Sequence, residues 1–179
     1  GAEKTRVLNA IADALVDATA RIVAANGDDL ERGASTGLAI GLLDRLRLDD
    51  GRIAALAEAV REVAVLPDPI GEVVRGHRSP TGVAIEQVRV PFGVIGAIYE
   101  ARPNVTVDIA AIALRSGNAV VLRGGRAAEA SNAVLVEIMR DTLASHGIDP
   151  EAIQTIDEFG REGARELMQA RGLVDVLVP

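Results

Sequence analysis

Apolar residues recur at helical spacing through the first third of the chain. From Glu3 to Ala25 they follow one face of a helix, and the polar run "ANGDD" marks a stop and a restart. A shorter helix is expected to follow through "DDLERGA". The 3-4-3 spacing of apolar residues from Ile53 to Ala64 predicts another helix, with Asp49 or Asp50 as its N-cap.

The pattern changes between residues 71 and 91. β-Branched residues lie on either side of a centre rich in Gly, Ser, Pro and Thr, which is typical of a long hairpin. Val83 and Ile85 share one face of its second strand, whereas Val88 and Val90 have the opposite parity, so a bulge or bend is predicted between them. Because a two-stranded ribbon is marginal alone, we expect it to lie against another sheet or subunit.

From Gly93 onward, short apolar runs alternate with helical patterns. The runs are "VIGAIY", "AVVLR", "AIQTI" and "VDVLV", and the helices between them are expected at Asn104–Arg115, Ala128–His146 and Arg161–Ala170. Uninterrupted apolar strands that alternate with helices are typical of a parallel sheet covered on both faces. The predicted fold class is therefore α/β, with a doubly wound, mostly parallel Rossmann-like sheet.

These patterns divide the chain into three parts. Residues 1–70 are expected to form helices that pack on the sheet domain, residues 71–91 a β-hairpin arm, and residues 92–179 the first part of the α/β domain. The last predicted strand stops at Val178–Pro179, so we expect it to be a sheet edge or the neighbour of a missing strand. The chain is accordingly expected to be a fragment whose start is also trimmed.

Composition narrows the possible functions. With 49% apolar residues among 179, the chain can bury a sizeable core, and only three aromatic residues are present. So few aromatic side chains, together with a net charge of −7, speak against nucleic acid as a partner. No apolar run approaches the length of a membrane span and no signal-peptide pattern occurs, so we expect no membrane partner and a cytoplasmic location.

The sequence contains no Cys, which excludes disulfides, thiolate metal sites and a thiol nucleophile within these residues. His77 and His146 are isolated from each other and from carboxylate clusters, so no metal site is predicted.

Candidate ligand-binding residues follow the predicted strands. Ligands of doubly wound sheets lie outside the carboxyl ends of the strands, so the loops after Tyr99, Arg123 and Ile156 should share one rim. In the first loop, "YEARPNV", the positive end of a helix that starts near Asn104 favours an oxyanion or a phosphate. Asn104 either donates to an oxyanion or caps its own helix, and Arg102 either binds an acyl-phosphate or carboxylate or is a surface residue beside a turn.

The second loop, "VLRGGRAAEASN", places two cations and two glycines directly after a strand. Arg123 and Arg126 would lie near a cofactor ribose or its 2′-phosphate, and the backbone of Gly124 and Gly125 could approach a ligand closely. The alternative is a strand-to-helix turn that simply requires glycine.

The third loop, "IDEFGREGARELM", has Gly160 and Gly163 at the start of a helix, a weak sign of phosphate or adenine contact. The acidic stretches "DEFGRE" and "DDLERG" are interpreted as solvated helix ends, and Ser131 or Asn132 as a helix-face or cap residue.

Two motifs resemble a known family across nearly the whole chain. "YEARPNVTVD" and "SGNAVVLRGG", preceded by "LLDRLRLDDGRIAALAEAVREVAVLPDPIGEV" and followed by "GLVDVLVP", resemble the γ-glutamyl phosphate reductases of the aldehyde dehydrogenase superfamily. The resemblance implies NADPH-dependent reduction of L-glutamate 5-phosphate to L-glutamate 5-semialdehyde, in proline biosynthesis. In that chemistry a Cys thiolate attacks the acyl-phosphate, phosphate leaves, and hydride reduces the thioester.

The same resemblance implies roles for individual residues. Asn104 falls at the oxyanion-donating Asn, and Arg123 falls where relatives carry a Lys that contacts the adenosine ribose. Arg102 becomes the candidate for the phosphate or carboxylate of the substrate. Gly124, Gly125 and Gly160 stay candidates for cofactor contact on their loop patterns alone, because "EFGREG" is a looser version of the family's stretch. The family carries its nucleophilic Cys in a downstream domain, which this chain lacks, so the chain alone is expected to be inactive.

The resemblance also implies partners and leaves alternatives. The hairpin would act as an oligomerisation arm in a homo-oligomer, and glutamate 5-kinase is a possible partner, since a fused kinase-reductase is one alternative. Another is an aldehyde dehydrogenase relative that reduces a different acyl donor. A third is a non-catalytic binding module on the same scaffold.

Overall fold

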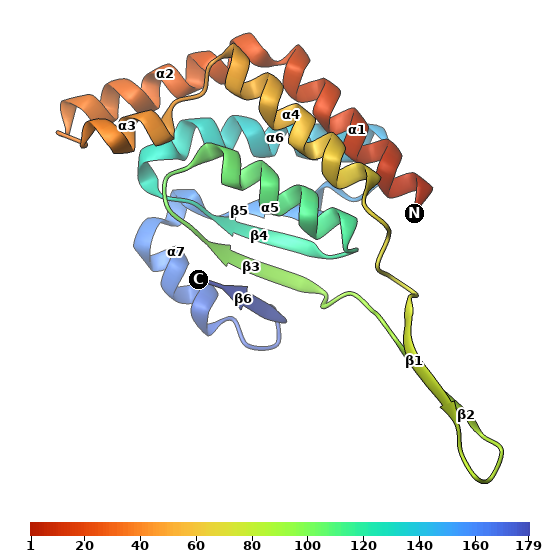
Figure 1. Cartoon of the computed structure of the whole chain (residues 1–179). Helices are drawn as coiled ribbons and strands as arrows, with labels where there is room; N and C mark the ends of the chain where they lie inside the picture. Colours follow the sequence, from red (N-terminus) through yellow and green to blue (C-terminus); the bar gives the residue numbers. More distant parts are fainter.

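A computed structural model describes all residues from 1 to 179 (Figure 1). The helices are α1 (Ala2–Asp17), α2 (Thr19–Ser35), α3 (Ile40–Leu46), α4 (Asp50–Val65), α5 (Pro103–Arg115), α6 (Glu129–Ser145) and α7 (Gly160–Gln169). The strands are β1 (Val73–Arg78), β2 (Ala84–Val88), β3 (Val94–Ile98), β4 (Ala119–Arg123), β5 (Ile153–Thr155) and β6 (Val176–Val178). One-turn 3-10 helices cover Arg126–Ala128, Pro150–Ala152 and Asp157–Phe159.

The sheet confirms the predicted fold class. Its strand order is β5-β4-β3-β6 and all three pairings are parallel. The chain proceeds from β3 to β4 to β5 in one direction, and β6 then pairs with the other side of β3. The strand order therefore reverses between β3 and β6, and β6 forms an edge, as expected for the last strand.

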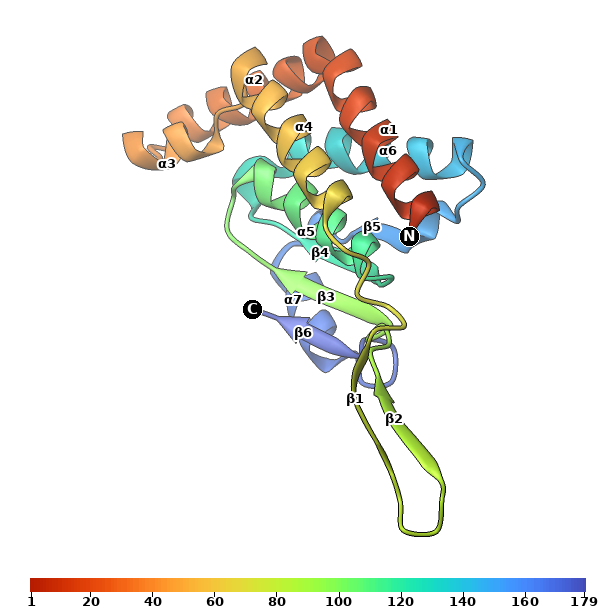
Figure 2. The ribbon, with the colours of Figure 1, turned by 45° about the vertical axis from the view of Figure 1, so that its right-hand side comes forward.

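Helices cover the two faces of the sheet unequally. In Figures 1 and 2, α5 and α6 lie on one face with α1 and α4 stacked beyond them, whereas α7 alone lies on the other face. A cluster of 25 buried, mostly aliphatic residues runs from α1 through α4 to β4, α6 and β5, and it includes nothing from α7 or β6. The N-terminal helices therefore share one core with the sheet.

The break between the first two helices lies at Ala18, and the prediction of a break at "ANGDD" is wrong. That polar run lies inside α2, where Asn26 is hydrogen-bonded to the end of α3 and the residues after it. Asn26 donates to Leu46 O at 2.8 Å and accepts from Leu48 N at 2.7 Å. Tertiary hydrogen bonds thus override the local turn signal. α3 was not predicted, whereas α4 begins as expected, with Asp49 accepting from Arg52 N at 2.9 Å.

The hairpin projects from the body of the molecule in both ribbon views (Figures 1 and 2). Every residue of β1 and β2 is exposed, including the apolar side chains of Val73, Ile85 and Val88. The register shifts between Val73 and Arg75, opposite Val88 and Gln87. The predicted irregularity therefore exists near Val88, but the extra residue belongs to the first strand and not to the second.

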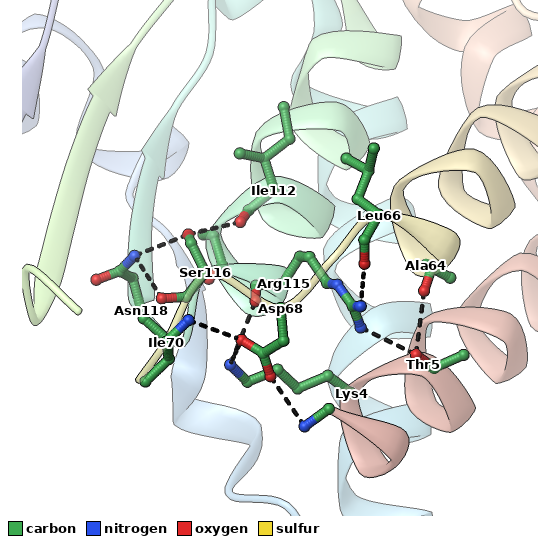
Figure 3. A network of polar contacts seen from close by, with 12 residues as sticks. Lys4, Thr5, Ala64, Leu66, Asp68, Ile70, Ile112, Arg115, Ser116 and Asn118 are labelled. Atoms are coloured by element: carbon green, nitrogen blue, oxygen red, sulfur yellow. Dashed lines mark hydrogen bonds and ion pairs between the residues drawn. The ribbon is translucent and has the colours of Figure 1, made fainter. Parts of the chain in front are cut away.

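The root of the hairpin is fixed by polar contacts (Figure 3). Arg115, at the end of α5, is buried and donates to Thr5 Oγ1 at 2.9 Å and to the carbonyl of Leu66. Lys4 Nζ lies 2.9 Å from Asp68 Oδ1. These bonds hold the segment between α4 and β1 against α1 and α5, at the amino end of the sheet.

No helix is both long enough and apolar enough to cross a lipid bilayer.

The N-terminus of α6 is capped by a side chain from another helix. No residue next to α6 caps it, but the fully buried Asp29 of α2 accepts from Ala130 N at 3.1 Å, from Ser131 N at 2.8 Å and from Ser131 Oγ at 2.7 Å. A carboxylate at this position also opposes the positive end of the helix dipole. Asp29 therefore joins α2 to the sheet domain.

We expect Asp29→Ala to lower the free energy of unfolding by about 2–4 kcal/mol, because two backbone N–H groups and one hydroxyl would lose their acceptor in the interior. Urea denaturation of the 179-residue chain measures the change. Asp28→Ala is the matched control, since Asp28 is exposed and makes no side-chain hydrogen bond. Equal urea midpoints for the two variants would contradict the capping role.

Candidate functional site

Three loops meet at the carboxyl ends of β3, β4 and β5, as predicted. Tyr99 N donates to Arg123 O at 3.0 Å and Ile156 N donates to Leu122 O at 2.9 Å, so the parallel pairing continues just past the strands. Gly124 N then donates to the Asp157 carboxylate at 2.6 Å. The residues after the three strands therefore form one continuous rim.

A chain of buried hydrogen bonds runs beneath this rim. Thr106 Oγ1 donates to Asn132 Oδ1 at 2.7 Å, and Asn132 Nδ2 donates to Asp157 Oδ2 at 2.8 Å. The Tyr99 hydroxyl lies 2.8 Å from Thr106 Oγ1. Because the single proton of Thr106 is committed to Asn132, Tyr99 must be the donor in that pair. This series of hydrogen bonds thus runs from the Tyr99 phenol to the Asp157 carboxylate.

Burial perturbs the two ends of this chain. Desolvation raises the pKa of Asp157 above its ordinary value, although the donors Asn132 and Gly124 pull it in the opposite direction. Desolvation likewise raises the pKa of the Tyr99 hydroxyl. Tyr99 therefore stays protonated and keeps its role as a donor.

The interpretation of "DEFGRE" and "DDLERG" as solvated helix ends is wrong for one residue in each. Asp157 is 9% exposed and Asp29 is not exposed at all. Both carboxylates are buried because each accepts backbone N–H groups from a different segment, which replace the lost water. Ser131 and Asn132 are also buried, and neither caps its own helix.

The two glycines after β4 are packed against protein. A Cβ on Gly124 would collide with the Asn132 amide, and one on Gly125 would lie 2.6 Å from Ala101 N. A larger residue at Gly125 would push away the loop after β3, and one at Gly124 would displace the Asn132 side chain of α6. This close packing supports the alternative that the strand-to-helix turn requires glycine at both positions. Neither glycine lines the neighbouring pocket.

A pocket of about 710 Å³ opens above the rim, beside the start of α7. It is lined by Arg123, Arg126, Arg161 and Gly160, together with Phe159 and the acidic residues Glu129, Asp157 and Glu158. Arg123 Nε donates to Gly160 O at 3.3 Å, which leaves its two terminal nitrogens without a hydrogen bond or ion pair. The structure thus brings Arg123 and Gly160 together, as the sequence predicted.

The three arginines of this pocket make no ion pair with the acidic residues around them. Guanidinium groups that are not engaged in ion pairs can bind a phosphate-bearing ligand. A second, mostly apolar pocket of about 600 Å³ lies between α7 and the sheet and shares Phe159 with the first. Together they offer a polar and an apolar compartment, which fits the phosphate and the base of a nucleotide cofactor.

Asn104 lies on the opposite side of the rim. It is the second residue of α5 and does not cap that helix, so the capping alternative is wrong. Its Nδ2 instead donates to Asp108 Oδ2 at 3.3 Å, and both residues line a pocket of about 360 Å³ against α4. The uncapped start of α5 and the exposed Asn104 amide leave donors available to an oxyanion.

Arg102 does not line the pocket of Asn104. Its Nη2 lies 3.1 Å from Glu100 Oε2, and its Nε is buried without a hydrogen-bond partner. Of the two candidate residues in the first loop, only Asn104 therefore lines this pocket. Sequence reasoning also missed Asp108, although it lies one helical turn after Asn104.

No group of three or more His, Asp or Glu side chains is arranged to hold a metal ion.

The reversal of strand order defines this chain as a doubly wound α/β domain, and the polar rim at the carboxyl ends of its strands is the candidate ligand site. A sequence model described as the aldehyde dehydrogenase family matches residues 3–177, and the chain belongs to this family.

Within that family, the chain is similar to proteins named gamma-glutamyl phosphate reductase. The one from Kineococcus radiotolerans is 62% identical over 178 residues, which are 99% of this chain and 41% of the relative. The one from Clavibacter michiganensis is 62% identical over 177 residues, with the same coverage. The chain thus spans about 41% of the length of these relatives.

A crystal structure agrees with this similarity. Gamma-glutamyl phosphate reductase from Thermotoga maritima superposes with a TM-score of 0.95 at 37% identity, over 99% of this chain and 43% of that protein. The enzyme from Saccharomyces cerevisiae gives a TM-score of 0.90 at 32% identity.

Gly125→Ala should lower the free energy of unfolding by about 1–3 kcal/mol, because the new methyl group would push the loop after β3 away from the loop after β4. Gly27→Ala should have the opposite sign, a gain of about 0.5–1 kcal/mol, since Gly27 lies in helix α2 with open space around it. Chemical denaturation of both variants tests the difference. A neutral Gly125→Ala would show that the two loops are not in tight contact.

Asp157 should titrate above the ordinary aspartate value of 3.8. Because the folded chain then binds this proton more tightly than the unfolded chain, the contribution of Asp157 to stability is fully present below 3.8 and is lost as pH rises through the folded-state pKa. NMR of chain labelled with ¹³C at the aspartate carboxyl groups measures the midpoint, and Asp157→Asn assigns the signal. A midpoint at or below 3.8 would contradict the prediction, because the hydrogen bonds from Asn132 and Gly124 would then outweigh the effect of burial.

Proposed function

We propose that this chain is the cofactor-binding part of a γ-glutamyl phosphate reductase. The enzyme would reduce L-glutamate 5-phosphate to L-glutamate 5-semialdehyde and phosphate with NADPH, in the cytoplasm. The observation that carries the proposal is the 62% identity to a protein of that name over 99% of this chain. The TM-score of 0.95 with a second such enzyme supports it.

The cofactor would occupy the two compartments beside α7 and supply the hydride. Arg123, with its terminal nitrogens free, would bind the 2′-phosphate that distinguishes NADPH from NADH, and Arg126 and Arg161 would add positive potential to the same pocket. Gly160 has φ +55°, a conformation that favours glycine, and its carbonyl orients Arg123 through the Nε bond.

The acyl group would lie on the other side of the rim, at Asn104. Its amide and the uncapped first turn of α5 would donate to the carbonyl oxygen as negative charge develops on it. The bond from Asn104 Nδ2 to Asp108 uses one amide proton and leaves the other for the substrate. Arg102, paired with Glu100, would act near the leaving phosphate only if that pair opened.

The nucleophilic thiol is absent from these residues, because the sequence contains no Cys. We therefore propose that the 179-residue chain binds cofactor and does not turn over substrate. The thiolate would come from the rest of the longer polypeptide that its relatives represent.

The exposed hairpin supports a homo-oligomer. β1 and β2 bury no side chain within the chain, and their apolar residues would be covered by a second subunit. Glutamate 5-kinase is the partner that we propose for substrate supply, because an acyl-phosphate hydrolyses readily in water.

A non-catalytic binding module on the same scaffold is the second candidate, and the absence of Cys favours it. The gene product that carries this chain should be assayed for NADPH consumption with L-glutamate 5-phosphate. Turnover excludes the binding module. Absence of turnover with this substrate, but not with another acyl donor, would replace the proposed substrate and keep the reaction class.

Arg123→Leu should weaken NADPH binding about 10- to 100-fold, the effect of one lost charge-assisted contact to phosphate, and should change NADH binding little. Fluorescence titration of the 179-residue chain with each nucleotide measures both constants. Arg165→Leu is the matched control, because Arg165 is exposed on α7 and lines no pocket near the rim. An equal loss for NADPH and NADH would remove Arg123 from 2′-phosphate recognition.

A further inference from the structure

The pocket beside Asn104 has the chemistry of an amino-acid site. Its lining includes Asp108 and Asn104, which we call the acidic wall, and three arginines of α3, α4 and the segment between them, which we call the basic wall: Arg45, Arg47 and Arg52. One acidic side chain therefore shares a cavity of about 360 Å³ with three basic ones.

Asp108 lacks a cationic partner. Its carboxylate is half-buried, makes no ion pair, and receives a single weak hydrogen bond at 3.3 Å from Asn104. Burial raises the pKa of Asp108, and the hydrogen bond from Asn104 opposes this shift only in part. A ligand ammonium group would supply the missing compensation.

The three arginines of the basic wall differ in their contacts: one is held by other residues of the protein, and two make no ion pair. Arg52 is held by Asp44 Oδ1 at 2.8 Å and by the carbonyl of Arg47 at 3.1 Å. Arg45 and Arg47 are exposed and make no ion pair. Their guanidinium groups are thus available to a carboxylate.

Apolar side chains complete the lining of this pocket. Leu48 and Leu56, each 5% exposed, line the pocket together with Ala55 and Ala59. These residues would contact methylene groups of a ligand. The pocket therefore offers a carboxylate, free guanidinium groups and an aliphatic surface.

We propose that this pocket binds the α-amino acid end of the substrate, with Asp108 binding the ammonium group and Arg45 and Arg47 binding the α-carboxylate. The proposal rests on the proposed function, because it requires Asn104 to contact the reacting carbonyl. Asn104 Nδ2 and Asp108 Oδ2 lie 3.3 Å apart, so one ligand can contact both side chains. L-Glutamate 5-phosphate, whose amino nitrogen lies four bonds from the reacting carbonyl carbon, is long enough to do so.

The test uses a substrate pair that differs only in the amino group. The full-length gene product is assayed in the direction of aldehyde oxidation, with NADP⁺ and phosphate, on L-glutamate 5-semialdehyde and on glutarate semialdehyde. Asp108→Asn should lower kcat/KM for the amino substrate about 10- to 100-fold, mainly through KM, and leave the substrate without an amino group unchanged. Asp28→Asn, on the exposed face of α2, should change neither value.

The basic wall gives a second, independent readout. Arg45→Gln combined with Arg47→Gln should raise KM about tenfold or more for both substrates, because both carry the carboxylate.

Each outcome bears on the inference. Equal loss for the two substrates in Asp108→Asn would overturn it, because Asp108 would then act only by holding Asn104. A wild-type enzyme that does not distinguish the two substrates would overturn it as well. A wild type inactive on both aldehydes would instead remove the proposed function, and the inference with it.

Discussion

The buried carboxylate of Asp157 is the contact on which the rest of the site depends. It joins β5 to the loop after β4 through Gly124 N, and to α6 through the Asn132 amide. A charge in this position is tolerated only because both of its oxygens accept hydrogen bonds. The same arrangement leaves no room for a side chain at Gly124. One ionisable group thus fixes the loop that presents Arg123 to the adjoining pocket.

The two long helices that start at the rim differ in what their N-termini bind. α6 is closed by Asp29, whose carboxylate occupies the position that an external anion would take. α5 has no capping side chain, and its first turn adjoins Asn104. Because an uncapped N-terminus attracts negative charge, the start of α5, and not that of α6, is the one that can receive an external anion.

Local patterns predicted most of the elements and few of the long-range polar contacts. β4 has the predicted boundaries, and α5 begins one residue earlier than predicted, because apolar runs and the Pro103 start signal act locally. The burial of Asp29 and Asp157 depends on donors about 100 and 30 residues away in the chain. No local pattern distinguishes such a carboxylate from a solvated one. Pairing of Asn104 with Asp108, at a spacing of one turn, was the one site contact that the sequence could have revealed.

The buried hydrogen-bond chain also connects the two sides of the proposed site. Thr106, two residues after Asn104, lies at one end of it with Tyr99, and Asp157, which lines the cofactor pocket, lies at the other. In the proposed reaction, hydride transfer requires the cofactor and the acyl carbon to be held about 3–3.5 Å apart, so the two binding sides must not move independently. The neutral side chains of Tyr99, Thr106 and Asn132 donate in series to the Asp157 carboxylate, which gives rigidity without a second charge in the interior. These hydrogen bonds therefore hold the start of α5 and the pocket of Arg123 in one fixed relation, as the proposed reaction requires.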